Sequence, residues 1–345
     1  MTARNAFVDY LSEVRPLIDR WLTPTSKTLE PGGSIQEDLL RYLFDPYDFF
    51  VAGGGKRTRP ALCLLGCEAV GGNREHALSV AAAIEHFQAA ALIHDDIADE
   101  SLLRRGHPCL HCTEGVGLAI NAGDHGLVRV ISTVLGDDRL AKDVRLRIIE
   151  ELVSMEERTL EGQALDLGWA RDGRWDITED EYLYMARHKT AYYSAATPLA
   201  AGAIVGSANE EQVRALWNFG MGAGLAFQLQ DDLMNLVGDG EKQGKDFRSD
   251  ITEGKRTLVV VRALETLGGT QRDELLDILS SHETDPQRLA HAVQLLDGSG
   301  AVDYVRQYAH TLVERAKLEL DGQRLDEHAV EILRAMADYF VERSN

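Results

Sequence analysis

Three aspartates close an apolar helical stretch, Ile84–Arg105, which reads IEHFQAAALIHDDIADESLLRR. Asp95 lies four positions before Asp99 and Asp96 lies three before it, so on a helix the carboxylates share one face. They follow about three turns of helix, and the carboxyl end of a helix disfavours anions. Carboxylate oxygens suit Mg2+, which binds one or two carboxylates, waters and substrate phosphates. The pattern predicts a magnesium site, with a solvated acidic helix end as the alternative.

A second aspartate pair ends another apolar helical stretch, Phe227–Asp239, which reads FQLQDDLMNLVGD. Asp231 and Asp232 are adjacent, and Asn235 follows about one turn later. Divalent ions bound to two such clusters could together hold a polyanion such as diphosphate. The repetition favours metal binding over two coincidental solvated helix ends.

A glycine-rich segment followed by cations lies upstream, in VAGGGKRTRPALCLLGCEAVGG, residues 51–72. Three glycines precede Lys56, Arg57 and Arg59, and Pro60 suits the first turn of the helix that follows. Backbone N–H groups, cations and a helix N-terminus together make an anion cradle. The alternative is a basic helix cap.

Further cations follow each aspartate cluster or lie between them. Arg104 and Arg105 come just after the first cluster, and arginine suits bidentate phosphate contacts. Lys189 and Thr190 interrupt an apolar and aromatic helix, where a snorkelling lysine is the alternative. The polar loop Gly240–Arg256 could close over a diphosphate, or be a solvated surface loop. Its cations include Lys242, Lys245, Lys255 and Arg256.

The composition narrows the class of function. The 345 residues are 44% hydrophobic and carry a net charge of −20, so nucleic acid is not an expected partner. An anionic substrate would therefore have to meet metal ions and local cations. The N-terminus lacks the apolar run of a signal peptide, and no uninterrupted apolar stretch predicts a membrane span. Together with four cysteines, these features predict a cytoplasmic protein.

The cysteines fall into two pairs. Cys63 and Cys67 lie one helical turn apart and are interpreted as core thiols. Cys109 and Cys112 form a CxxC with two histidines in HPCLHC, residues 107–112. Zinc binding or redox chemistry there is an alternative that needs these ligands to converge from one short loop.

Helical periodicity dominates the chain, and strand alternation is nearly absent. Helices are predicted over residues 5–22, 36–50, 60–70, 74–100, 116–135, 140–169, 178–205, 210–237, 252–267, 272–280, 286–297, 301–320 and 327–343. No composition shift or repeat marks a boundary. The sequence therefore predicts one all-α domain over residues 1–345.

The motifs together resemble the trans-type isoprenyl diphosphate synthases, or polyprenyl synthetases, most of all the bacterial geranylgeranyl diphosphate synthases. GGKRTRP (Gly54–Pro60) is similar to that family's isopentenyl diphosphate motif. DDIAD, followed by LLRRG, is similar to its first aspartate-rich motif. LEGQALDL, HKT and FQLQDD follow in the family's order. The resemblance implies the isoprenoid synthase fold, a bundle of ten or more helices around a central apolar catalytic cavity.

The resemblance also implies roles for single residues. The ligands of three Mg2+ ions, with substrate bound, would be Asp95, Asp96, Asp99, Asp231 and Asp232. Residues supporting the metal waters would be Gln163, Asp166 and Asn235. The allylic diphosphate would contact Arg104, Lys189, Lys242 and the nearby Lys255. Isopentenyl diphosphate would be held by Lys56, Arg59, Gln88 and Arg105. Thr190 and Gln228 would lie beside the reacting carbons.

Two features depart from the family pattern. Asn235 stands where the family usually has aspartate, and its neutral oxygen is expected to bind metal more weakly without abolishing activity. The loop HPCLHC replaces small or hydroxyl residues, and its sequence indicates no function.

The implied reaction joins isopentenyl diphosphate to the cation left when an allylic diphosphate departs, inside a cavity that excludes water. Two rivals remain: a terpene cyclase or head-to-head coupling enzyme, and a non-catalytic subunit of a heteromeric synthase. A cyclase would not need the second diphosphate site of Lys56, Arg59 and Gln88, and a non-catalytic subunit should have lost charged site residues. The resemblance also implies a homodimer.

Product length depends on the helix before the first aspartates. Ala90 and Ala91, one turn earlier, are small where short-chain members of the family commonly carry an aromatic floor. Phe87, a further turn down, is then the expected floor, which predicts geranylgeranyl diphosphate, with twenty carbons. The alternatives are farnesyl diphosphate, or thirty carbons and more if Met155 or Leu160 closes the tunnel.

Overall fold

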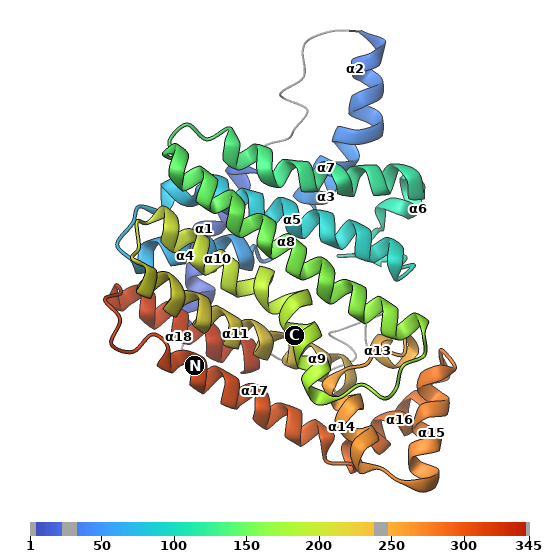
Figure 1. Cartoon of the computed structure of the whole chain (residues 1–345). Coiled ribbons are helices and arrows are strands. Elements are labelled where there is room, and N and C mark those ends of the chain that lie inside the picture. The colour runs from blue at the N-terminus through green and yellow to red at the C-terminus, as the bar shows by residue number, and fades with distance from the viewer. Residues whose placement is uncertain (1–4, 23–32, 238–247, 343–345) are drawn as a thin grey trace. The chain divides into compact units, whose positions relative to one another are not determined.

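The computed structural model describes residues 5–22, 33–237 and 248–342. These residues are overwhelmingly helical (Figure 1), which confirms the all-α prediction. One short hairpin, β1 (Leu103–Arg104) and β2 (His107–Pro108), interrupts the helices. Strands of two residues are too short to show the alternation that identifies a strand in sequence.

The contacts within the chain define two compact units. Unit 1 comprises Met1–Ser154, Thr197–Arg214 and Arg324–Ile332. Unit 2 comprises Met155–Ala196, Ala215–Gln323 and Leu333–Asn345. One domain over residues 1–345 stays a prediction.

The elements of unit 1 are α1 (Ala6–Trp21), α2 (Ser34–Leu39), the π-helix η2 (Leu40–Phe44), α3 (Asp45–Ala52), α4 (Thr58–Ala69), the 3-10 helix η3 (Arg74–Ala77), α5 (Leu78–Ala98), α6 (Leu110–Glu114), α7 (Val116–Leu135) and α10 (Thr197–Val205). Those of unit 2 are α9 (Glu179–Ala186), the π-helix η4 (Arg187–Ala196), α13 (Ser249–Thr252), α14 (Leu258–Thr266), α15 (Gly269–Ser280), α16 (Pro286–Gly298) and α17 (Ala301–Leu318). Residues of both units belong to α8 (Lys142–Arg171), α11 (Glu210–Val237) and α18 (Glu327–Glu342).

Small residues set the packing of α4 against α10 in unit 1. A Cβ added to Gly202 would lie 1.9 Å from the Cys63 carbonyl oxygen, and one on Gly66 would lie 2.2 Å from the Leu199 carbonyl oxygen. The two backbones therefore approach more closely than any side chain would permit. Cys63 and Cys67 are buried in this contact, which confirms them as core thiols.

The core of unit 1 centres on α5, which runs beside α7 and also packs on α4 (Figure 1). By length and composition alone, the helix Arg74–Ala98 could cross a membrane, but 78% of its apolar window is buried inside the protein. Packing between helices thus accounts for the apolar character of the segment that carries the first aspartates.

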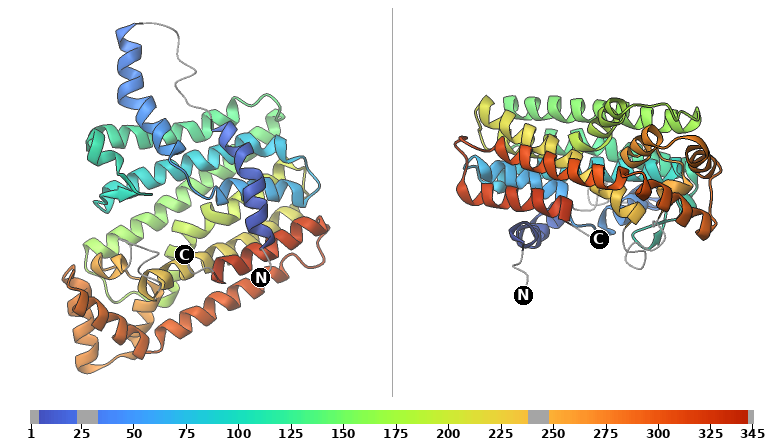
Figure 2. Two further views of the ribbon diagram at one scale, coloured as in Figure 1. Left: turned by 180° about the vertical axis from the view of Figure 1, so that it is seen from behind. Right: turned by 90° about the horizontal axis from the view of Figure 1, so that it is seen from below.

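In unit 2, α14 packs against α9 and α17, and α15 lies beside α16, both orange in Figure 2. The sequence predicts one helix over residues 252–267, but the structure divides it. Gly254 takes a left-handed conformation (φ +63°), and the Thr257 side chain accepts a hydrogen bond from the Val260 N–H to start α14. A glycine turn and an N-cap therefore end one helix and begin the next.

Candidate active site

The first aspartate motif ends α5 in unit 1. Asp99 is the C-cap of the helix, Asp95 is half-buried, and Asp96 is 1% exposed. Arg104 donates to Asp96 Oδ1 from Nε at 2.8 Å and from Nη2 at 2.5 Å. Burial by itself would lower the pKa of Arg104, but its pairing with Asp96 raises it. Arg104 is therefore held at the first aspartate motif, and its contact with the allylic diphosphate stays a prediction.

The hairpin after this motif aims Arg105 at the glycine-rich loop. Arg104 pairs with His107, which leaves Arg105 and Gly106 as a two-residue turn with φ values of +54° and +81°. Two positive φ angles match the type I′ turn, whose twist suits a hairpin. The Arg105 guanidinium donates to the carbonyl oxygen of Gly54. The hairpin thus brings together two motifs far apart in the sequence.

Four arginines gather where this hairpin meets the loop. Burial lowers the pKa of Arg105, and the guanidiniums of Arg57, Arg104 and Arg59 lower it further, against the opposing effect of Glu85. Such a set of like charges is strained when partly buried. An anion placed among them would relieve the repulsion, so the cluster has the chemistry of a phosphate site.

Two glycines make room for this arrangement. Gly54 and Gly55 have φ values of +95° and +131°, and a Cβ on Gly55 would lie 3.1 Å from Arg105 Nη2. Lys56 is exposed and Arg59 is half-buried at the start of α4. Gln88 on α5 is also half-buried, and its Oε1 has no hydrogen-bond partner among the described residues. Unit 1 therefore contains the whole residue set predicted for isopentenyl diphosphate.

Arg57, one of the three cations of the predicted anion cradle, is instead the buried anchor of the loop. Its Nε donates to Asp19 Oδ1 at 2.9 Å, its Nη2 donates to the Val51 carbonyl at 2.8 Å, and its Nη1 donates to Glu85. Arg57 and Glu85 are each 5% exposed. The two carboxylate partners, Asp19 and Glu85, lie far from Arg57 in the sequence, so no local pattern could reveal this role.

The three predicted chain-length residues differ in their surroundings. Ala90 is fully buried against α7: a Cβ on Gly126 would lie 2.9 Å from the Ala90 Cβ and 3.1 Å from the Tyr47 ring. Phe87 is also buried, whereas Ala91 is half-buried. Space for a larger side chain is therefore greater at position 91 than at position 90.

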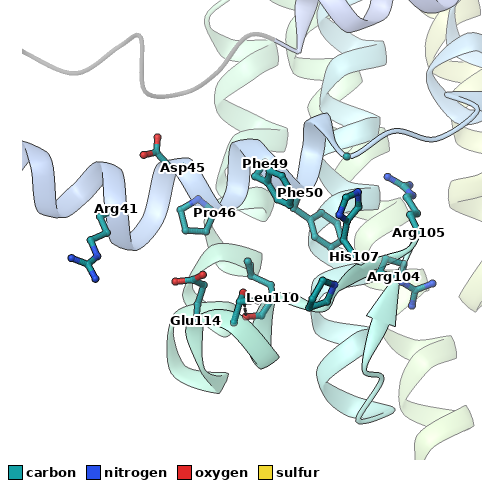
Figure 3. A pocket seen from close by; sticks show the side chains of 13 residues that line it. Arg41, Asp45, Pro46, Phe49, Phe50, Arg104, Arg105, His107, Leu110 and Glu114 are labelled. Atoms are coloured by element: carbon teal, nitrogen blue, oxygen red, sulfur yellow. Dashed lines mark hydrogen bonds between the residues drawn. The ribbon is translucent and has the colours of Figure 1, made fainter.

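A cavity of about 670 Å3 lies beside the hairpin in unit 1 (Figure 3). Pro46, Phe49 and Phe50 of α3 and the two hairpin arginines are among the residues that line it. An aromatic wall next to guanidiniums suits an amphiphilic anion.

The second aspartate motif lies in unit 2, and its two members differ. Asp231 is exposed, whereas Asp232 is buried and accepts hydrogen bonds from Tyr182 Oη at 2.6 Å and from Gln228 Nε2 at 2.7 Å. Burial raises the pKa of Asp232, and the nearby Asp250 carboxylate raises it further. Asp231 is thus the more accessible metal ligand, and a metal contact by Asp232 stays a prediction.

Lys189 and Thr190 lie in the π-helix η4, where the sequence predicts an α-helix. A π-helix has one more residue per hydrogen-bonded turn than an α-helix. Three neighbouring glycines face its backbone: an added Cβ would lie 2.2 Å from Lys189 N at Gly162, 2.6 Å from Ala196 Cα at Gly220 and 3.0 Å from Ala191 Cα at Gly224. Unit 2 therefore accommodates the wide turn by removing the side chains opposite it.

Contacts within unit 2 join other predicted site residues. Lys189 forms an ion pair with Asp166; burial favours the neutral acid, but Lys189 holds the pKa of Asp166 below its ordinary value. Thr190 Oγ1 donates to Gln228 Oε1 at 2.6 Å. Gln163 is half-buried on α8, and Lys242 lies outside the described residues.

Asn235 has a structural task that the sequence did not predict. Its Nδ2 donates to Ser249 Oγ at 3.1 Å, and its Oδ1 accepts from the Asp250 N–H at 3.1 Å. An aspartate could accept here but could not donate. Lys255 Nζ lies 3.2 Å from Asp250 Oδ1, so this turn also places a predicted diphosphate ligand.

The segment HPCLHC contains no zinc site. Cys109 is buried near Asp96 and Cys112 is exposed. Among the described residues, no group of three or more His, Cys, Asp and Glu side chains could hold a metal ion. The zinc alternative is therefore wrong. Neither aspartate motif is a protein-only cage, which fits a metal such as Mg2+ that keeps waters and substrate phosphates as ligands.

Known proteins are similar to this chain in sequence and in fold. The family model described as polyprenyl synthetase matches residues 40–296. A short chain isoprenyl diphosphate synthase of Methanothermobacter thermautotrophicus is 39% identical over 340 residues, covering 98% of this chain and 99% of its own. Geranylgeranyl pyrophosphate synthetase from Pyrococcus horikoshii Ot3 superposes with a TM-score of 0.85 at 30% identity over 98% of each chain. The Corynebacterium glutamicum geranylgeranyl pyrophosphate synthase complexed with isoprenyl diphosphate and magnesium superposes with a TM-score of 0.86 at 30% identity, over 97% of this chain and 98% of its own. These similarities confirm the predicted fold and reach archaeal as well as bacterial proteins.

Proposed function

Because the chain belongs to the polyprenyl synthetase family, we propose that it joins isopentenyl diphosphate head-to-tail to an allylic diphosphate. The product is a trans-polyprenyl diphosphate, mainly geranylgeranyl diphosphate. The observation that carries the proposal is the arginine cluster around Arg105, because guanidiniums at the glycine-rich loop need an anion. The magnesium and isoprenyl diphosphate in the Corynebacterium glutamicum structure support the same chemistry.

Isopentenyl diphosphate is the anion that this cluster would take. Lys56 and Arg59 at the N-terminus of α4, together with Arg105, offer charge-assisted hydrogen bonds to its phosphates. Gln88 adds a side-chain amide from α5. Arg57 does not contact substrate in this scheme, since its donors are used to fix the loop.

The allylic diphosphate would be bound through the two aspartate motifs. By family resemblance, Asp95 and Asp99 in the first motif and Asp231 in the second would hold Mg2+, with Asp96 and Asp232 as neighbouring carboxylates, and three ions are proposed to bind with substrate. When bound, Mg2+ neutralises the charge that develops on the departing diphosphate. Arg104, Lys189, Lys242 and Lys255 would contact the same diphosphate.

The remaining site residues act on the allylic cation. The Thr190 hydroxyl and the Gln228 amide are neutral groups that would stabilise the positive charge through their dipoles, and neither carries an anionic oxygen that would capture the cation. The isopentenyl double bond attacks the cation, and the released diphosphate takes the proton lost from the new chain. The side chains around the cation would have to exclude water, which would otherwise capture it.

The product length follows from the helix above the first aspartates. The growing chain would pass the small, half-buried Ala91, and the buried Phe87 would close the tunnel after twenty carbons. Met155 is buried and Leu160 is exposed on α8, and closure by either would give a longer product.

We also propose a homodimeric, cytoplasmic enzyme whose residues 1–345 act as one polyprenyl synthetase domain. Exposed apolar side chains on α7 support a dimer, namely those of Val116, Ile120, Val128 and Leu135. Light scattering on the purified protein would measure the subunit number, with a single-chain mass contradicting the dimer.

The deciding experiment incubates pure protein with labelled isopentenyl diphosphate, Mg2+ and one allylic primer at a time, then separates products by chromatography. We expect chain extension that stops mainly at twenty carbons. Cyclised hydrocarbon without use of isopentenyl diphosphate would show a terpene cyclase, and no product with any primer would show a non-catalytic subunit. Mainly fifteen carbons, or thirty and more, would keep the activity and overturn the assigned floor.

A further inference from the structure

A chain of four side chains in unit 2 ends on a buried carboxylate. Thr190 Oγ1 donates to Gln228 Oε1 at 2.6 Å, Gln228 Nε2 donates to Asp232 Oδ1 at 2.7 Å, and Tyr182 Oη donates to Asp232 Oδ2 at 2.6 Å. Asp232 and Tyr182 are 6% and 1% exposed. Both carboxylate oxygens thus accept hydrogen bonds from side chains that come from separate helices.

The direction of these hydrogen bonds fixes the orientation of the Thr190 hydroxyl, at the outer end of the hydrogen-bonded series. Because Gln228 turns its NH2 toward the carboxylate, its carbonyl oxygen must face Thr190. The Thr190 hydroxyl proton is then committed to Gln228, so the lone pairs of Thr190 Oγ1 point elsewhere. Hydrogen bonds that all donate toward one anion polarise each other, which makes the Thr190 oxygen more electron-rich.

Tyr182 is placed firmly at the inner end. It belongs to α9, whose start is closed by a reciprocal capping box between Thr178 and Glu181, and α9 packs against α14. The phenol hydroxyl holds one carboxylate oxygen of Asp232, and Gln228 holds the other. Without the hydroxyl, the carboxylate would lose the contact that fixes its rotation, and Gln228 could turn its amide.

We propose that Tyr182 is a positioning residue, which acts through Asp232 and Gln228 to aim the Thr190 oxygen at the allylic cation. This inference rests on the proposed prenyltransferase activity and adds a residue that neither sequence motif contains. Asp232 is accordingly a support for the cation-stabilising pair, and Asp231 carries the metal contact of the second motif.

The test is Tyr182→Phe, which removes only the hydroxyl. We expect kcat to fall about tenfold, equivalent to about 1.4 kcal/mol, while KM for isopentenyl diphosphate and for the allylic primer stays unchanged. The matched control is Tyr10→Phe, since Tyr10 is also buried and donates to a carboxylate, that of Glu68 in unit 1. Tyr10→Phe should lower the melting temperature without changing kcat.

A double-variant cycle separates an effect of Tyr182 that acts through Thr190 from a general loss of stability. In a Thr190→Val background, which lacks the hydroxyl, Tyr182→Phe should reduce kcat by less than twofold. In a Thr190→Ser background, which keeps the hydroxyl, the full loss should return. If Tyr182→Phe does not fold, Asp232→Asn replaces the shared acceptor and should show the same dependence on position 190.

Several results would overturn the inference. Unchanged kcat in Tyr182→Phe, or a loss that keeps its full size in Thr190→Val, would show that Tyr182 does not act through Thr190. An Asp232→Asn loss that keeps its full size in Thr190→Val would assign Asp232 to the metal instead. Failure of the proposed function is a separate result, because the unaltered protein would then form no prenyl product.

Discussion

Arg57→Ala tests whether a buried guanidinium holds the glycine-rich loop in place. Arg57 and Glu85 are each 5% exposed, and the same guanidinium donates to Asp19 and to the Val51 carbonyl. Removing one partner of a buried ion pair costs about 3–5 kcal/mol, because the other charge stays buried. We expect the free energy of unfolding to fall by that amount. At about 2–4 °C per kcal/mol, the melting temperature would drop by roughly 6–20 °C.

Urea unfolding followed by circular dichroism would measure the loss. Arg15→Ala is the matched control, since Arg15 pairs with the same Asp19 but both side chains are substantially exposed. An exposed pair contributes about 0–1 kcal/mol, so the control should stay close to the unaltered protein. Arg57→Met combined with Glu85→Leu removes both charges and should recover much of the lost stability.

The opposite pattern would refute this reasoning. The free energy of unfolding of Arg57→Ala could lie within about 1 kcal/mol of that of the unaltered protein, while its KM for isopentenyl diphosphate is raised. That result would show that the guanidinium binds substrate. The burial of Arg57 would then not describe the working enzyme.

Three further predictions concern the proposed chemistry. Asp95→Ala and Asp231→Ala should each nearly abolish turnover in Mg2+. The melting temperature should not fall, because each change removes a carboxylate from a repelling cluster. An unfolded variant or full activity would contradict the metal assignment. Lys56→Ala should raise KM for isopentenyl diphosphate roughly tenfold or more, since a charge-assisted contact contributes about 1.5–3 kcal/mol. An equal rise in KM for the primer would argue against separate sites. Ala91→Phe should shorten the product and Phe87→Ala should lengthen it, both read by chromatography, and unchanged products from Phe87→Ala would place the floor elsewhere.

Much of the fold follows from local pattern. Val116–Leu135 and Glu210–Val237 were predicted with the bounds that the structure gives, because long apolar periodicity and glycine or polar breaks mark such helices clearly. The hairpin after the first aspartates was missed, since its strands are only two residues long. Arg105–Gly106, which forms the turn, carries a glycine signal in the sequence, but the flanking strands are too short for that signal to predict a hairpin.

For the site too, contacts between residues close in sequence could be predicted, and contacts between distant segments could not. Spacing alone placed Asp95, Asp96 and Asp99 together, because they lie within one helical turn of each other. Contacts between distant segments could not be predicted: Arg57 meets Glu85 across 28 positions and Tyr182 meets Asp232 across 50. Such pairs depend on how helices pack, and no period in the sequence encodes them.

The π-helix that carries Lys189 and Thr190 constrains which mutational paths are open to this chain. Deleting one residue would return η4 to α-helical width and leave gaps opposite Gly162, Gly220 and Gly224. Enlarging one of these glycines first would force a Cβ against the helix backbone, at a cost of about 1–3 kcal/mol for overpacking. Each step is unfavourable alone, and only the combination restores close packing. The π-helix and its three glycines therefore show sign epistasis. Single substitutions made one at a time cannot remove the wide turn, and they cannot enlarge the small residues around it.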